Sequence, residues 1–127
     1  MTPAEFKTAR ESLGVSALFI AKRLGVTVGI VWRYESPQRL IDVPERAADL
    51  MRDLLVDFEL SADFMAEHVK DSEHGAIPRH VDIAEFEAVV PALVGWGQLT
   101  QGLLLAEVQR RLRTAIEYVY PGEGAAA

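Results

Sequence analysis

Residues 16–35 read SALFIAKRLGVTVGIVWRYE, and this stretch decides the fold of the first part of the chain. Ser16 and Thr27 are residue types that cap helix N-termini, and each precedes a short segment with helical apolar spacing. Gly25 stands between the two segments, where the positive φ of a tight turn is easiest for glycine. Ala21 is small enough for two helices to cross closely. The pattern predicts a helix-turn-helix, which can place its second helix in a DNA major groove.

Charge is distributed unevenly along the chain. The 127 residues carry a formal net charge of −6, but residues 1–42 sum to +2 and residues 43–127 to −8. The basic part therefore coincides with the predicted pair of helices. Because DNA affinity depends on local neutralisation of phosphates, this local excess matters more than the total. The acidic remainder is expected to limit non-specific binding.

The flanking residues extend the helical pattern in both directions. Residues 2–5, Thr-Pro-Ala-Glu, form a capping-box pattern that predicts a helix ending at Gly14. From about Pro44, apolar residues hold one broad helical face as far as Val69. Ser61 can cap a restart inside this segment, so one long helix and two shorter helices both fit the pattern.

The rest of the chain predicts a smaller helical element. Residues 77–81 alternate apolar and polar side chains, a pattern compatible with a short edge strand. Asp82 opens a short helix through about Val90, and an amphipathic helix is expected from Trp96 to about Tyr118. The predicted organisation is a helical domain at 1–69 with a long fourth helix, a linker at 70–76, a dimerisation region at 77–120 and a disordered tail at 121–127.

Residues 3–55 resemble the Cro/C1-type (XRE) helix-turn-helix domain of phage and bacterial repressors. The matching residues are Ala21, Gly25, Val26, Val31 and the run Tyr34-Glu35-Ser36. Pro37 and Gln38 stand near the position where the family has a glycine, so the following loop is expected to differ. Residues 94–101, VGWGQLTQ, are similar to the C-terminal segment of anti-CRISPR-associated (Aca) autorepressors, in which a helical element preceded by a short strand forms the dimer.

The resemblance implies a mostly α-helical protein, with an N-terminal lambda-repressor-like domain and a small C-terminal dimerisation element. It also implies a sequence-specific transcriptional repressor, autoregulatory in the Aca-like case, that binds an inverted-repeat operator as a homodimer with half-sites ~34 Å apart. The residues implied to face bases are Thr27, Val28, Gly29, Trp32 and Arg33. Those expected on DNA phosphates are Arg10, Lys22, Arg23 and Arg39, and those expected in the dimer interface are Ile77, Val81, Trp96, Leu99, Leu103 and Leu104.

Each base-facing candidate has a physical interpretation. Arg33 is the strongest, because a guanidinium can donate two hydrogen bonds to guanine. Val28 can contact a thymine methyl, and Gly29 permits a close backbone approach. Trp32 packs against thymine methyls or a sugar in this interpretation; the alternative is burial against a neighbouring helix or the partner copy. Because Val28, Gly29 and Ile30 replace polar residues, DNA shape is expected to contribute to recognition.

The sequence offers little support for catalysis or for a metal site. His68, His74 and His80 recur at six-residue steps, but six residues of helix place successive positions on opposite faces. No serine–histidine or phosphate-loop pattern occurs. An enzymatic function, a cofactor and a small-molecule ligand are therefore not expected.

Other properties indicate the cellular setting and leave one rival function. The chain has no cysteine, no signal-peptide pattern and no apolar run near the ~20 residues that span a membrane, so a cytoplasmic location is expected.

The cations Arg110, Arg111 and Arg113 are best explained as partners of a helix macrodipole, with a second DNA-backbone contact as the alternative. The rival is a protein-binding regulator, antitoxin-like or a phage interaction module, whose acidic C-terminal half binds a partner. RNA stays open as a second ligand.

Overall fold

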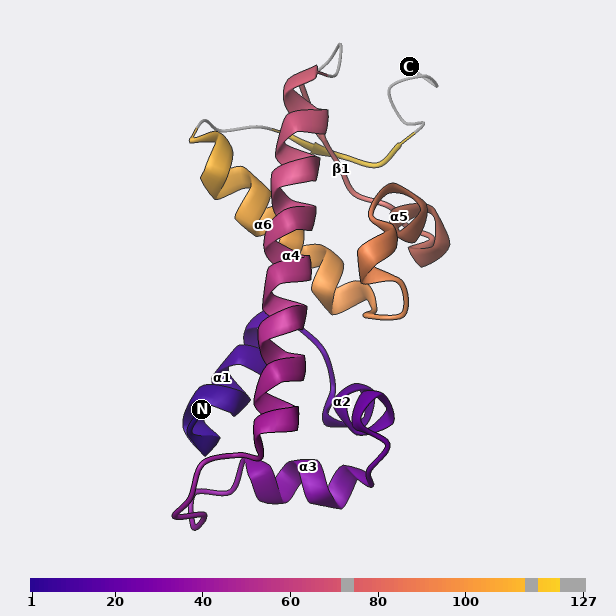
Figure 1. The fold of residues 1–127 in the computed structure, drawn as a ribbon. Helices are drawn as coiled ribbons and strands as arrows, with labels where there is room; N and C mark the ends of the chain where they lie inside the picture. The colour runs from indigo at the N-terminus through magenta and orange to yellow at the C-terminus, as the bar shows by residue number, and fades with distance from the viewer. Residues whose placement is uncertain (72–74, 114–116, 122–127) are drawn as a thin grey trace. The chain divides into compact units, whose positions relative to one another are not determined.

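The computed structural model describes residues 1–71, 75–113 and 117–121, and within them the chain is mostly helical (Figure 1). This confirms the mostly α-helical class that the sequence predicts. None of the described helices combines the length and the apolarity that a membrane crossing requires.

The chain divides into two compact units, residues 1–56 and residues 57–127. The boundary falls within α4 (Glu45–Asp71), which begins in the first unit and ends in the second. The sequence left open whether this segment forms one helix or two, and the structure has one. Ser61, the candidate for a restart, is 5% exposed and lies inside the continuous helix.

The first unit is built from short helices around one apolar core. Its elements are α1 (Pro3–Leu13), α2 (Ala17–Leu24), α3 (Val28–Tyr34) and the start of α4. The most buried core side chains, none more than 1% exposed, are Phe6, Leu13, Ile20, Ala21, Val31, Ala47, Ala48, Met51 and Leu54. Removal of these side chains from water is the main driving force for the unit's folding.

Local capping interactions define the ends of α1 and the start of α2. Thr2 N donates to Glu5 Oε1 at 2.9 Å and Glu5 N donates to Thr2 Oγ1 at 3.1 Å, which completes the predicted capping box. Gly14 ends α1 in the left-handed conformation, with φ 71°. The hydroxyl of Ser16 accepts a hydrogen bond from Phe19 N at 3.0 Å and starts α2.

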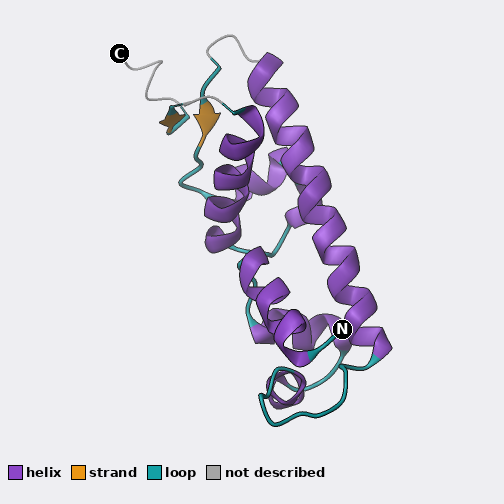
Figure 2. Cartoon of the chain, turned by 90° about the vertical axis from the view of Figure 1, so that its left-hand side faces the viewer, coloured by secondary structure: helices purple, strands orange, loops and turns teal. Residues whose placement is uncertain are grey.

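The second unit combines the end of α4 with a small parallel sheet and further helices (Figure 2). Its other elements are β1 (Ile77–Pro78), α5 (Ile83–Val89), the 3-10 helix η1 (Pro91–Leu93), α6 (Gln98–Leu112) and β2 (Tyr118–Val119). Ile77 N donates to Glu117 O at 2.9 Å and Arg79 N donates to Val119 O at 2.8 Å, which pairs the two strands in parallel. A strand within residues 77–81 fits the predicted alternation, and its proline is tolerated because the sheet has only two strands, both of them edges.

The final helix predicted from Trp96 to about Tyr118 is shorter in the structure. It starts two residues after Trp96 and ends at Leu112, where Arg113 adopts a left-handed conformation with φ 57°. Tyr118 lies in β2 instead of the helix. Apolar spacing alone does not separate the end of a helix from a strand that follows it closely, because short apolar runs fit both.

A buried glutamine joins α6 to the residues that follow β1. The side chain of Gln101 is fully buried. Its Oε1 accepts a hydrogen bond from His80 N at 2.7 Å, and its Nε2 donates to His80 O at 3.0 Å. One amide side chain thus satisfies both backbone groups of a residue that has left the sheet.

Two segment predictions reach residues that the structure does not describe. The linker predicted at 70–76 overlaps the end of α4 at residues 70 and 71, and residues 72–74 lie outside the described part. The tail predicted at 121–127 lies outside it from residue 122 onward.

Candidate nucleic-acid interface

The connection between α2 and α3 is a tight turn around a glycine. Gly25 has φ 70° and ψ 32°, and its N–H points to the carbonyls of Ala21 and Lys22. A residue with a Cβ is strained at this φ, so the position favours glycine. Val26 N also donates to Ala21 O, at 3.0 Å. Ala21 and Val31 are both at most 1% exposed, as close packing of α2 and α3 requires.

An ion pair fixes the C-terminal end of α3 to α1. Glu35, the residue directly after α3, accepts hydrogen bonds from Arg10 Nε at 2.6 Å and Nη2 at 2.9 Å. The two side chains are largely buried, with 16% of Arg10 and 6% of Glu35 exposed. Arg10 Nη1 donates to Val15 O at 3.0 Å. One guanidinium therefore joins α1, the loop before α2 and the end of α3, in the bidentate geometry that makes such pairs strong.

This ion pair changes the role expected for Arg10. The sequence-based prediction places Arg10 on a DNA phosphate, but its guanidinium faces inward and all three of its nitrogens donate to protein acceptors. The hydrogen bonds that Arg10 donates to Glu35 also raise the pKa of Arg10, against the opposing effect of burial. Arg10 is thus a residue that positions α3, and we do not include it among the phosphate contacts.

Tyr34, the last residue of α3, lies between an aromatic ring and a guanidinium. Its ring meets Phe6 of α1 edge to face, with the centroids 6.2 Å apart and an interplanar angle of 86°. On the following loop, Arg39 Cζ lies 5.4 Å from the centroid of the Tyr34 ring, and Arg39 Nη2 donates to Asp42 O at 3.1 Å. Arg39 is therefore half-buried and oriented by the protein.

The outward face of α3 carries the predicted base-facing side chains. Trp32 is 61% exposed, so it is not buried against a neighbouring helix of the first unit. Arg33 is exposed, and within the described residues its side chain forms no hydrogen bond or ion pair. Thr27 occupies the predicted N-cap position, but its hydroxyl makes no cap hydrogen bond and is solvent-exposed. These three side chains are available to an external ligand.

The first turn of α3 contains a glycine that the fold does not require. Gly29 has no positive φ, and a Cβ built on it would meet only Thr27 Oγ1, at 3.9 Å. A glycine within a helix costs roughly 0.5–1 kcal/mol relative to alanine. Val28, beside it, is half-buried. The missing side chain at Gly29 therefore leaves space on the helix surface for an approaching molecule.

Two further cations predicted to contact phosphates lie on α2. Lys22 is exposed, and its ammonium has no hydrogen bond or ion pair within residues 1–71, 75–113 and 117–121. The guanidinium of Arg23 lies 4.7 Å from the centroid of the Phe19 ring, a cation–π contact that leaves its donors unsatisfied by protein. Both cations are free to pair with phosphate.

Three of the residues predicted for the dimer interface belong to the core of the second unit. Ile77 and Leu104 are fully buried, and Trp96 is 5% exposed. Within one copy of the chain these side chains are covered, so they do not form a surface. The apolar pattern identified a buried face correctly but did not show that the same chain covers it.

The other predicted interface residues lie at the surface of the second unit. Val81 and Leu99 are 75% and 66% exposed, and Leu103 is half-buried. Leu60 and Phe64, one helical turn apart on α4, are also 61% and 55% exposed. They border an apolar groove of about 210 Å³, lined by Leu60, Ser61, Phe64, Val89, Val90, Pro91 and Ala92.

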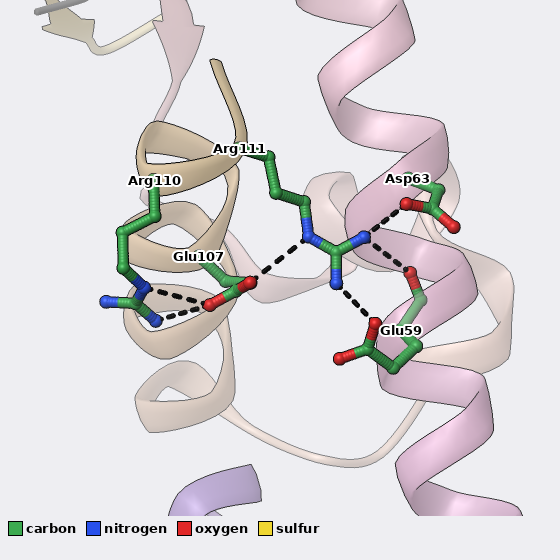
Figure 3. A network of polar contacts seen from close by, with 5 residues as sticks. All are labelled: Glu59, Asp63, Glu107, Arg110 and Arg111. Atoms are coloured by element: carbon green, nitrogen blue, oxygen red, sulfur yellow. Dashed lines mark hydrogen bonds and ion pairs between the residues drawn. The ribbon is translucent and has the colours of Figure 1, made fainter. Parts of the chain in front are cut away.

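The C-terminal arginines of α6 are used inside the second unit (Figure 3). Arg111 donates from Nη2 to Glu59 Oε2 at 2.5 Å, from Nη1 to Asp63, and from Nε to Glu107 Oε1 at 3.2 Å. Arg110 donates to Glu107 Oε2 from Nη2 at 2.6 Å and from Nε at 2.9 Å. These contacts tie α6 to the second half of α4. They occupy all three nitrogens of the Arg111 guanidinium, whereas Arg110 is 67% exposed and Arg113 is exposed.

The same network shifts the titration of Glu107. The hydrogen bonds from Arg110, reinforced by those from Arg111 and opposed by burial, lower the pKa of the Glu107 carboxyl. Burial alone would lower the pKa of Arg111, but hydrogen bonds to Glu59 and Glu107 outweigh it and raise that pKa. Both groups are therefore held in their charged forms.

The described residues contain no group of three or more His, Asp or Glu side chains placed to hold a metal ion. His74, one of the three evenly spaced histidines, lies outside the described part. His80 lies with its Nδ1 3.6 Å from Glu85 Oε2, as a pair and not as part of a cluster.

No protein-family model matches this chain, and no curated protein or solved structure is significantly similar to it. The function is therefore inferred from the residues and their geometry.

Proposed function

We propose that this protein is a sequence-specific DNA-binding regulator of the Cro/C1 (XRE) helix-turn-helix type, in which α3 enters the major groove. The observation that carries the proposal is the contrast between the two sides of α3. Val31 packs inward and Glu35 is clamped by Arg10, whereas Trp32 and Arg33 face solvent. A short helix held rigidly on one side presents its other side in the fixed orientation that base readout needs.

The exposed side chains of α3 suit different parts of a base pair. Arg33 supplies paired donors for the O6 and N7 acceptors of guanine, a contact worth ~1–3 kcal/mol of discrimination. Trp32 offers a flat apolar surface to thymine methyl groups. Thr27, whose hydroxyl makes no cap hydrogen bond, can donate to a base or a phosphate, and Gly29 lets the backbone approach closely.

Phosphate contacts in this proposal come from Lys22, Arg23 and Arg39. Each copy then neutralises about three phosphates, and a dimer about six. Since log K falls with log[salt] by about 0.9 for each phosphate neutralised, the expected slope for the dimer is roughly −5. The acidic second unit repels DNA and holds non-specific binding down.

The proposal includes a homodimer, because one short helix buries too little surface for tight specific binding. We assign the contact between copies to the exposed apolar surface of the second unit around Leu60 and Phe64. This surface carries protruding apolar side chains beside a recessed apolar groove. A two-fold contact requires such self-complementarity, since the same patch must meet itself. Occupation of an inverted repeat in a promoter would repress transcription by excluding polymerase, and autoregulation is the simplest case.

Selection of bound sequences from random duplex DNA tests this proposal. The expected result is enrichment of an inverted repeat, with affinity that falls steeply between 50 and 200 mM salt, as about six phosphate contacts require. Failure to enrich any sequence, together with no binding at low salt, would reject DNA recognition.

Sedimentation of the full chain tests the dimer separately. The wild type is expected to be a dimer and Phe64→Glu a monomer that keeps its helical circular dichroism. Leu18→Glu, at an exposed apolar position of the first unit, is the matched control and should stay dimeric. A dimeric Phe64→Glu protein would show that the contact lies elsewhere.

A further inference from the structure

The most exposed large apolar side chain in the described part of the chain is Leu40, at 96%, and its neighbour Ile41 is 68% exposed. The two residues lie next to each other in the loop between α3 and α4, and we call this exposed pair the apex. Apolar side chains that stay in water forgo the favourable free energy of burial. Single exposed apolar residues are common, but two adjacent ones in one loop form a patch that a ligand can cover.

The loop that carries the apex is held in place at both ends. On the α3 side, Arg39 N donates to Ser36 O at 3.1 Å and Gln38 N donates to Ser36 Oγ at 3.2 Å. On the α4 side, Val43 N donates to Met1 O at 3.0 Å and Val43 is buried.

Arg39 connects the two sides of this loop. Its guanidinium lies against the Tyr34 ring and donates to Asp42 O at 3.1 Å. The apex therefore projects from a structured loop, and little entropy is lost when it meets a ligand.

The loop that carries Leu40 and Ile41 follows α3 directly in the chain. In both views the loop leaves the C-terminal end of α3 and stays at the same end of the first unit as that helix (Figure 1 and Figure 2). A helix in the major groove is bounded on each side by a phosphate ridge, and the minor groove lies beyond that ridge. A segment that follows the helix directly is placed to cross the ridge, with Arg39 over the phosphates.

We propose that Leu40 and Ile41 form an apolar wedge that enters the DNA minor groove next to the α3 contact and unstacks a base step there. This inference rests on the proposed DNA binding. Leucine and isoleucine are among the side chains that unstack base steps from the minor groove, with kinks of roughly 20–90°. Two adjacent, exposed aliphatic side chains fit a groove ~6 Å wide. The same tip is far smaller than the roughly 800 Å² that each partner contributes to a stable protein interface.

The wedge also accounts for the apolar character of α3. Val28, Gly29 and Ile30 leave the helix with few polar groups for base readout. A wedge adds specificity through deformability, because pyrimidine–purine steps such as TA and CA unstack most easily. We therefore expect the operator to contain such a step beside each α3 half-site, at a position that no polar side chain reads.

The test uses the full chain and the duplex obtained by selection from random DNA. 2-Aminopurine replaces an adenine at the predicted step, and dyes at the duplex ends report bending by energy transfer. Wild-type protein should raise the 2-aminopurine fluorescence several-fold and bend the duplex by roughly 20–90°. The double variant Leu40→Ser, Ile41→Ser should abolish both signals and weaken binding ~10-fold, while the α3 footprint stays in place.

The control variant Tyr120→Ser, at an exposed aromatic residue of the second unit, should behave as wild type. Specific binding by the wild type without bending or 2-aminopurine signal would overturn the wedge and leave the proposed function intact. A double variant that loses the dimer would also overturn it, because the apex would then be a contact between copies. No binding of any duplex by the wild type would instead reject the proposed function and the wedge with it.

Discussion

Arg33 and Arg111 both lie in the last turn of a helix, yet the structure uses them in different ways. Arg33, on α3 of the first unit, is exposed and without a partner in the described residues. Arg111, on α6 of the second unit, donates to Glu59, Asp63 and Glu107. The presence of an arginine in a helix therefore does not show whether its guanidinium is free to bind a ligand. That depends on whether the fold places acidic side chains within hydrogen-bonding distance of it.

The first unit contains both uses within a short stretch of chain. All three guanidinium nitrogens of Arg10 donate hydrogen bonds, two to Glu35 and one to the Val15 carbonyl, and this pairing fixes α3 against α1. Arg33 is left free on the face of α3 that the ion pair holds in position. In the proposed function, Arg10 holds α3 in the orientation that Arg33 needs to contact DNA. Substitutions at the two sites should therefore separate stability from binding.

The largest effect on stability is expected from Arg10→Met. It leaves the Glu35 carboxylate buried without its partner, and breaking a buried ion pair costs roughly 3 kcal/mol of unfolding free energy. Arg33→Met, at an exposed and unpaired arginine, should change it by less than ~0.5 kcal/mol. Urea denaturation followed by circular dichroism measures both. Similar small changes for the two variants would mean that the Arg10–Glu35 pair does not hold the unit together.

Arg111→Met, in the second unit, is expected to lower the free energy of unfolding by less than Arg10→Met does. Its partners Glu59 and Asp63 are more than half exposed, so each pair is screened by solvent. The network as a whole should contribute roughly 1 kcal/mol. Arg113→Met, at an exposed arginine two residues on, is the matched control and should be near neutral. If both variants lose equal stability in the same urea denaturation assay, the ion pairs of Arg111 do not contribute to the stability of the second unit.

Low pH should destabilise the second unit, because protonation of Glu107 removes the charge that pairs with Arg110 and Arg111. Its pKa is lowered in the folded state, so its stabilising contribution is complete above the unfolded pKa of about 4.3 and is lost as pH falls through the folded pKa. Urea midpoints measured from pH 7 to pH 3 should fall at the acid end. Glu107→Gln should lower the midpoint at pH 7 and flatten the acid dependence. An unchanged pH profile in this variant would contradict the assignment.

The smallest effect on stability is expected at Gly29, where stability and binding should move in opposite directions. Gly29→Ala should stabilise α3 by about 0.5 kcal/mol, because the position has room for a methyl group and no positive φ. The same methyl group should weaken binding to the selected DNA. Gly102→Ala, in α6 of the second unit, is the matched helical control and should leave DNA affinity unchanged. Unchanged affinity in Gly29→Ala would show that the backbone there does not approach the ligand.

Much of the first unit could be predicted because its signals are local. The Thr2–Glu5 capping box, the Ser16 cap and the left-handed Gly25 each follow from residues within a few positions of one another. The periodicity of apolar residues then identifies the buried side of each helix, including Ile20 and Val31.

The remaining features depend on contacts between residues far apart in the chain. Arg10 and Glu35 are 25 positions apart, and nothing near either one indicates that the acid is buried. Gln101 pairs with the backbone of His80, 21 positions away, and a lone glutamine on a helix carries no sign of this. Spacing also predicted an apolar face around Trp96, but which side chains cover it is a property of the folded second unit.

The most direct measurement compares Arg33→Ala with Arg110→Ala by fluorescence anisotropy on the selected duplex. Arg33 is free on α3, and Arg110 is paired with Glu107 on α6. Arg33→Ala is expected to weaken specific binding by roughly 1–3 kcal/mol and to keep the dimer, whereas Arg110→Ala is expected to bind within about twofold of wild type. Equal loss in both variants, or wild-type affinity in Arg33→Ala, would contradict the assignment of α3 as the DNA-reading surface.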